Sequence, residues 1–66
     1  MNLEIVKELV QSYDNDVTAN NFHNTDTLDK ILTMYSNEEA MGDFEQATEM
    51  ENQITLLSQR HNLELV

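Results

Sequence analysis

The first segment of the chain alternates apolar and polar residues with the period of an α-helix. Its apolar residues recur three or four positions apart, on one helix face: Leu3, Val6, Leu9, Val10 and Tyr13. This pattern predicts an amphipathic helix over about residues 2–13. The following stretch, residues 14–24, holds four Asn and two Asp and has no helical period. Because such side chains bond their own backbone in competition with a helix, we expect a loop there, anchored to the core by Val17 and Phe22.

Two more helices are predicted in the rest of the chain. A second helix over about residues 26–35 presents one apolar face, made of Leu28, Ile31, Leu32 and Tyr35. The sequence from Ser36 to Glu39 then fits a capping box, in which Ser36 caps a third helix running over about residues 37–62. Gly42 lies inside that helix, at a cost of about 1 kcal/mol relative to Ala, which packing can offset.

The third predicted helix carries an apolar stripe that includes Met50, Ile54 and Leu57. The stripe is either part of the core of a bundle or a seam between two chains, and its heptad pattern is compatible with both. We therefore expect one all-α domain over residues 1–66, with two short helices and one long C-terminal helix. A chain this small has a marginal core and no cysteine for a disulfide, so we also expect a homodimer.

The charge of the chain indicates that the predicted bundle is a candidate binding protein. The chain has thirteen acidic and three basic residues, a formal net charge of −10, and no Lys or Arg between Ile31 and Gln59. Each base has an acid nearby in the sequence, as Arg60 has Glu64. Self-repulsion of this size destabilises a compact state, so we expect the negative field to serve in attracting a basic partner.

Several other classes of function lack the residues that they need. No cysteine or serine nucleophile motif is present, the single glycine excludes a phosphate-cradling loop, and His23 and His61 have no partner at metal-ligand spacing. We expect no enzyme, no cofactor and no metal site. The scarcity of Lys and Arg argues against direct nucleic-acid binding, and no apolar run is long enough for a membrane span. The absence of cysteine is typical of a reducing compartment, so we expect a cytoplasmic protein.

The candidate binding residues are the acids of the base-free stretch. At about 100° per residue, Glu38, Glu45 and Glu49 form one row opposite the apolar stripe of the third predicted helix. Carboxylates one turn apart are about 5–6 Å from each other, a spacing comparable with that of DNA phosphates. The further acids assigned to this partner-binding face are Glu39, Asp43, Glu51, Asp14 and Asp16.

In length, acidity, absence of cysteine and helical pattern, the whole chain resembles the small acidic host-takeover proteins of bacteriophages. Some of these are DNA mimics that inhibit HU-type nucleoid proteins. The resemblance implies a competitive mechanism in the host cytoplasm, in which carboxylates occupy the Lys and Arg surface of a DNA-binding protein.

Two other functions remain open. The chain could be a small interaction module that binds through apolar helix faces, or an assembly component whose acids only keep it in solution. Binding driven by charge weakens as ionic strength rises, whereas apolar binding tolerates salt. This difference distinguishes the DNA mimic from the apolar interaction module.

Overall fold

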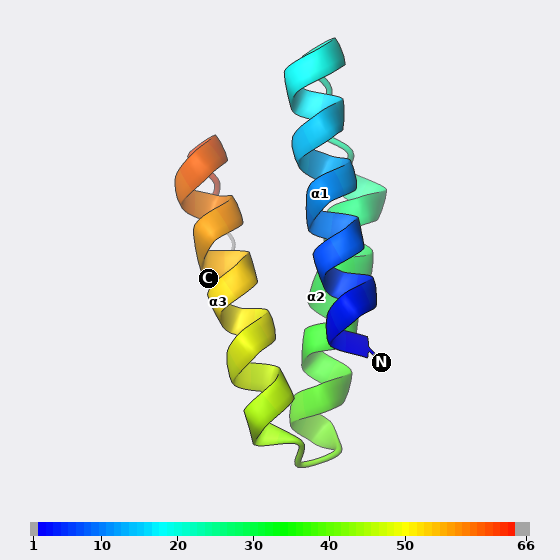
Figure 1. Cartoon of the computed structure of the whole chain (residues 1–66), viewed down its shortest axis with the longest axis vertical. Helices are drawn as coiled ribbons and strands as arrows, with labels where there is room; N and C mark the ends of the chain where they lie inside the picture. The colour runs from blue at the N-terminus through cyan, green and yellow to red at the C-terminus, as the bar shows by residue number, and fades with distance from the viewer. Residues whose placement is uncertain (1, 65–66) are drawn as a thin grey trace.

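The computed structural model describes residues 2–64, which form three helices in an up-down-up bundle (Figure 1). The helices are α1 (Asn2–Asn20), α2 (Thr25–Ala40) and α3 (Phe44–His61). Each helix packs against both others, with α1 and α3 parallel and α2 antiparallel to them. No strand occurs in the part of the chain that the structure describes, so the predicted all-α bundle is confirmed.

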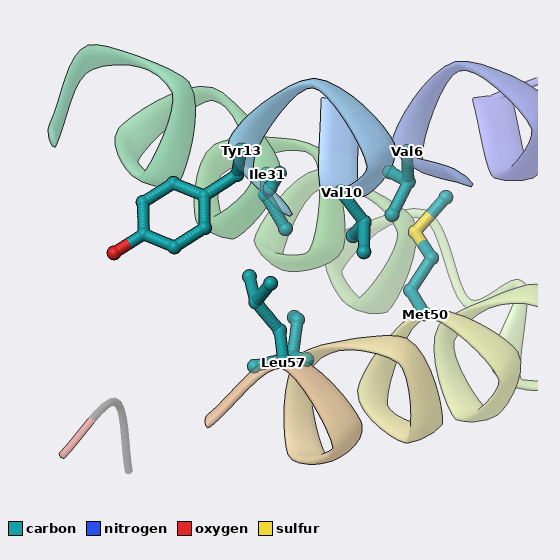
Figure 2. Close-up of a cluster of buried hydrophobic side chains, with 7 residues drawn as sticks. Val6, Val10, Tyr13, Ile31, Met50 and Leu57 are labelled. Atoms are coloured by element: carbon teal, nitrogen blue, oxygen red, sulfur yellow. The ribbon is translucent and has the colours of Figure 1, made fainter. Parts of the chain in front are cut away.

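The core is built from one apolar stripe on each helix. Figure 2 shows these side chains converging between the three ribbons. The buried cluster consists of Val6, Val10 and Tyr13 of α1, Ile31 of α2, and Met50, Ile54 and Leu57 of α3. The apolar stripe of α3 is therefore buried within a single chain.

The first helix is longer than the sequence analysis predicted. The expected loop over residues 14–24 is wrong, because α1 continues to Asn20 and only residues 21–24 are non-helical. Val17 follows Tyr13 by one helical turn and packs against the core, which extends the apolar stripe. The helix ends where Asn21 adopts a left-handed conformation, with φ 51°. Phe22, expected as a core anchor, is instead exposed.

The boundary between α2 and α3 also differs from the prediction. Ser36 lies inside α2, which continues to Ala40, and the break comes at Gly42, with φ 80°. The N–H of Gly42 donates to the carbonyl of Glu39, and the N–H of Asp43 to that of Glu38, each at 3.1 Å. This pair of bonds is a Schellman motif, which ends a helix on a left-handed residue. Asp43 then caps α3.

The three helices are consequently of similar length, with 19, 16 and 18 residues. The expectation of two short helices and one long helix is wrong. The predicted third helix, residues 37–62, combines the last turn of α2 with α3 across Gly42.

We predict that Gly42→Ala destabilises the chain by about 1 kcal/mol, because an L-residue is strained at positive φ. A Cβ added at Gly42 meets no atom within 4 Å, so backbone strain is the only expected contribution. Urea unfolding followed by circular dichroism measures the change. Gly42→Asn is the control and should lose less, since Asn tolerates this conformation better. A glycine inside a helix would give the opposite sign, with Gly42→Ala stabilising the chain.

Candidate acidic binding surface

The predicted row of Glu38, Glu45 and Glu49 does not form. Glu38 belongs to α2 rather than α3, and its side chain is buried, with 2% of the residue exposed. One of its carboxylate oxygens accepts a hydrogen bond from the Asn2 side-chain amide at 2.5 Å. The assignment of Glu38 to an exposed acidic face is therefore wrong, and the residue ties the start of α1 to the last turns of α2.

Asp14 is engaged in an ion pair that joins α1 to α3. Its carboxylate accepts from Nη2 of Arg60 at 2.9 Å and contacts Nε2 of His61 at 2.5 Å. Both partners lie in the last turn of α3, where positive charge is favourable. Arg60 thus pairs with an acid distant in sequence, and Asp14 is not available as an open carboxylate.

Three aromatic rings meet beside this ion pair, and no pattern in the sequence predicts their convergence. The hydroxyl of Tyr13 lies 2.6 Å from Nδ1 of His23, and the rings of His23 and His61 are 6.3 Å apart. Burial, and secondarily the charge of Asp14, raise the pKa of Tyr13. The three rings come from α1, the α1–α2 loop and α3, so only the tertiary fold could reveal the cluster.

Asp16 is half-buried and lies 3.4 Å from the side-chain amide of Asn24. Asn24 in turn caps α2 by accepting from the N–H of Thr27 at 3.2 Å. Asp14 and Asp16 both lie toward the C-terminal end of α1, whereas the α2–α3 turn lies at the other end of the bundle (Figure 1). The structure therefore does not bring these two acids together with those of α3.

A shallow groove of about 320 Å³ lies between the N-terminal turns of α1 and α3. It is lined by Leu3, Asp43, Glu45, Gln46 and Glu49. Gln46 holds the groove together, because it accepts from the N–H of Leu3 at 3.2 Å and donates to the carboxylate of Asp43 at 2.9 Å. Glu45 and Glu49 are exposed along its rim, one helical turn apart.

Two further acids, Glu39 of α2 and Glu51 of α3, lie near the hydroxyl of Tyr35. The hydroxyl of Tyr35 donates to Glu51 at 3.2 Å. Burial, the hydrogen bond to Glu51 and the negative charge of Glu39 and Glu51 raise the pKa of Tyr35. Glu39 and Glu51 are thus close enough to act on one phenol, although they come from different helices.

Of the six acids in the base-free stretch, all but Glu38 are exposed or half-buried, and we call these five the acidic surface: Glu39, Asp43, Glu45, Glu49 and Glu51. Within residues 2–64, no nitrogen of Lys, Arg or His comes within 4.0 Å of their carboxylates, because the ion pairs there all involve Asp14. Folding therefore does not neutralise the base-free stretch that the sequence contains. Among the same residues, no group of three or more His, Asp or Glu side chains is placed to hold a metal ion.

No family model matches the chain, and neither a curated protein nor a solved structure is significantly similar to it. None of the helices in residues 2–64 combines the length and apolar character needed to cross a membrane.

Proposed function

We propose that this chain is an acidic DNA-mimic protein, which binds the basic surface of a DNA-binding protein and blocks its access to DNA. The observation that carries the proposal is the uncompensated charge of the acidic surface. A cation supplied by a partner would meet carboxylates that have no competing ion pair within the described chain.

Geometry supports the same proposal. Glu45 and Glu49 are one turn apart on a helix, which spaces their Cβ atoms by about 5–6 Å. Phosphates of one DNA strand are also spaced by a few ångströms, about 3.4 Å when measured along the helix axis. Because α3 is packed into a bundle, its backbone is ordered before the partner arrives, which lowers the entropy lost on binding. A nucleoid protein of the HU type is the partner that the sequence resemblance suggests, and a homodimer would present two acidic surfaces.

We predict that the variant E45Q/E49Q/E51Q displaces DNA from an HU-type protein only at concentrations on the order of tenfold higher than the wild-type chain. The measurement is the fluorescence anisotropy of a labelled duplex bound to that protein, with the chain added as competitor. Raising the salt from about 50 to about 300 mM should weaken displacement by the wild-type chain, since exposed charges are screened.

The matched control is E4Q/E8Q/D29N, which removes the same number of charges from exposed positions on α1 and α2. It should displace DNA nearly as well as the wild-type chain. Equal losses in both variants would mean that net charge, rather than the acidic surface, determines binding. No displacement by the wild-type chain at low salt would contradict the proposed function for this class of partner.

The alternative is binding through an apolar face, and one feature favours it. An open groove of about 500 Å³ runs between α1 and α2, lined by Ile5, Leu9, Asp29, Lys30, Thr33 and Met34. A partner bound there would resist salt and would be lost on Ile5→Asp, while E45Q/E49Q/E51Q would leave it bound.

A further inference from the structure

Two large apolar side chains are exposed at the turn between α2 and α3. Met41 is 74% exposed and Phe44 is 69% exposed, the largest values for large apolar residues in residues 2–64. Neither side chain belongs to the core cluster. Isolated apolar residues on a surface are ordinary, but two such residues at one tip of the bundle form a candidate contact point.

The turn that carries them is held by hydrogen bonds at both ends. On the α2 side, the Schellman motif fixes Gly42 and Asp43 against the last turn of the helix. On the α3 side, the carboxylate of Asp43 accepts from the N–H of Gln46 at 3.3 Å. Met41 and Phe44 flank these two fixed residues. A partner would therefore meet a preorganised tip, with little backbone entropy left to lose.

Acids surround this tip, and no base is near it in the sequence. Glu39 precedes Met41, Asp43 precedes Phe44, and Glu45 follows, all of them in the acidic surface. A second copy of the chain would bring the same acids against this tip, so like charges would face each other. A basic protein would instead match the charge around the apolar residues.

We propose that Met41 and Phe44 are the apolar anchors of the binding surface, and that they enter an apolar recess on a basic protein. Lys or Arg side chains around that recess meet Glu39 and Glu45. This inference rests on the proposed function and specifies its partner. The partner offers an apolar contact within its basic surface, so the chain would bind with a salt-resistant component that charge mimicry alone does not supply. Aromatic and Met side chains at the centre of a polar rim are typical of residues that dominate binding energy.

The test uses two synthetic helical peptides of about 18 residues with the same number of Lys. One has Leu along one face, and the other has Gln in place of every Leu. We expect the wild-type chain to bind the Lys/Leu peptide on the order of tenfold more tightly, measured by fluorescence anisotropy at about 50 and 300 mM salt. The variant M41S/F44S should lose that advantage while binding the Lys/Gln peptide as the wild-type chain does.

The control variant is F22S/L56S, which removes two other exposed apolar side chains and should keep the preference for Leu. If M41S/F44S also keeps the preference, or if F22S/L56S loses it equally, the anchor assignment is overturned. Sedimentation of the chain alone provides a second test. A change in oligomeric state on M41S/F44S would assign the tip to a second copy instead.

If the proposed function itself is wrong, the peptide-binding experiment gives a different result. In that case the Lys/Gln peptide would not bind at low salt, or it would bind E45Q/E49Q/E51Q as well as the wild-type chain. Circular dichroism of each variant should show unchanged helicity, because all the replaced side chains are outside the buried core cluster.

Discussion

Leu57→Ala is expected to remove a large part of the stability of this chain, by about 2–5 kcal/mol. Leu57 is fully buried, and its side chain lies in the cluster formed by all three helices (Figure 2). Truncation removes apolar contacts and leaves a cavity that the surrounding helices cannot fill. A domain of this size has a total stability of only about 3–10 kcal/mol. Urea unfolding followed by circular dichroism should therefore show a much lower midpoint, or a population that is partly unfolded in water.

The neighbouring residue supplies the control. Leu56 has the same side chain but is 47% exposed, so Leu56→Ala should change the unfolding free energy by only about 0.5 kcal/mol. The effect of Leu57→Ala should also not depend on protein concentration, because the contacts are made within one chain. A midpoint for the variant that rises with concentration would indicate that Leu57 stabilises an association between chains instead.

The periodicity of apolar residues was sufficient to predict the fold class and much of the core. Spacings of three and four residues identified Val6, Val10 and Tyr13 on one face, and the same rule identified Met50, Ile54 and Leu57. This signal is strong because burial on one side of a helix requires it. It does not depend on where a helix begins or ends.

Helix ends were less predictable, since they depend on competing local signals. Both Ser36 with Glu39 and Asp43 with Gln46 have the spacing of a cap followed by an acid or amide three residues later. In the structure the second pair begins α3, because Gly42 takes the left-handed conformation that ends α2. The loop predicted in the Asn-rich stretch after Tyr13 is wrong for a related reason. Helical packing of Val17 outweighs the local preference of Asn and Asp for turns.

The wrong boundary between the second and third helices also led to the wrong assignment of Glu38 in the candidate site. Counting positions along one continuous helix placed Glu38 opposite the apolar stripe, beside Glu45 and Glu49. In α2, however, Glu38 follows the buried Ile31 by seven residues, or about two turns, so both side chains lie on the same inner face. The acids that lie within α3, Glu45, Glu49 and Glu51, were placed on an exposed surface, since their positions relative to the stripe did not depend on the boundary.

Glu38→Lys is expected to destabilise the chain by about 3 kcal/mol or more. The wild-type carboxylate is buried and accepts a hydrogen bond from the side-chain amide of Asn2. A lysine at this position would bury a positive charge and replace the acceptor by a donor, so the Asn2 amide would lose its partner. Urea unfolding of the purified variant measures the loss. Glu38→Gln keeps both the shape and an acceptor oxygen, and its effect should stay within about 1 kcal/mol.

Glu45→Lys is the matched reversal at an exposed position, and it should change the unfolding free energy by only about 0.5 kcal/mol. The contrast between these two reversals separates a structural acid from a surface acid. It also explains why binding should be tested with changes at Glu45, Glu49 and Glu51 alone: a variant that includes Glu38→Lys would lose binding through unfolding, whatever the partner. Equal stability of Glu38→Lys and Glu45→Lys would instead indicate that the side chain of Glu38 is exposed, and Glu38 would then be counted with the surface acids.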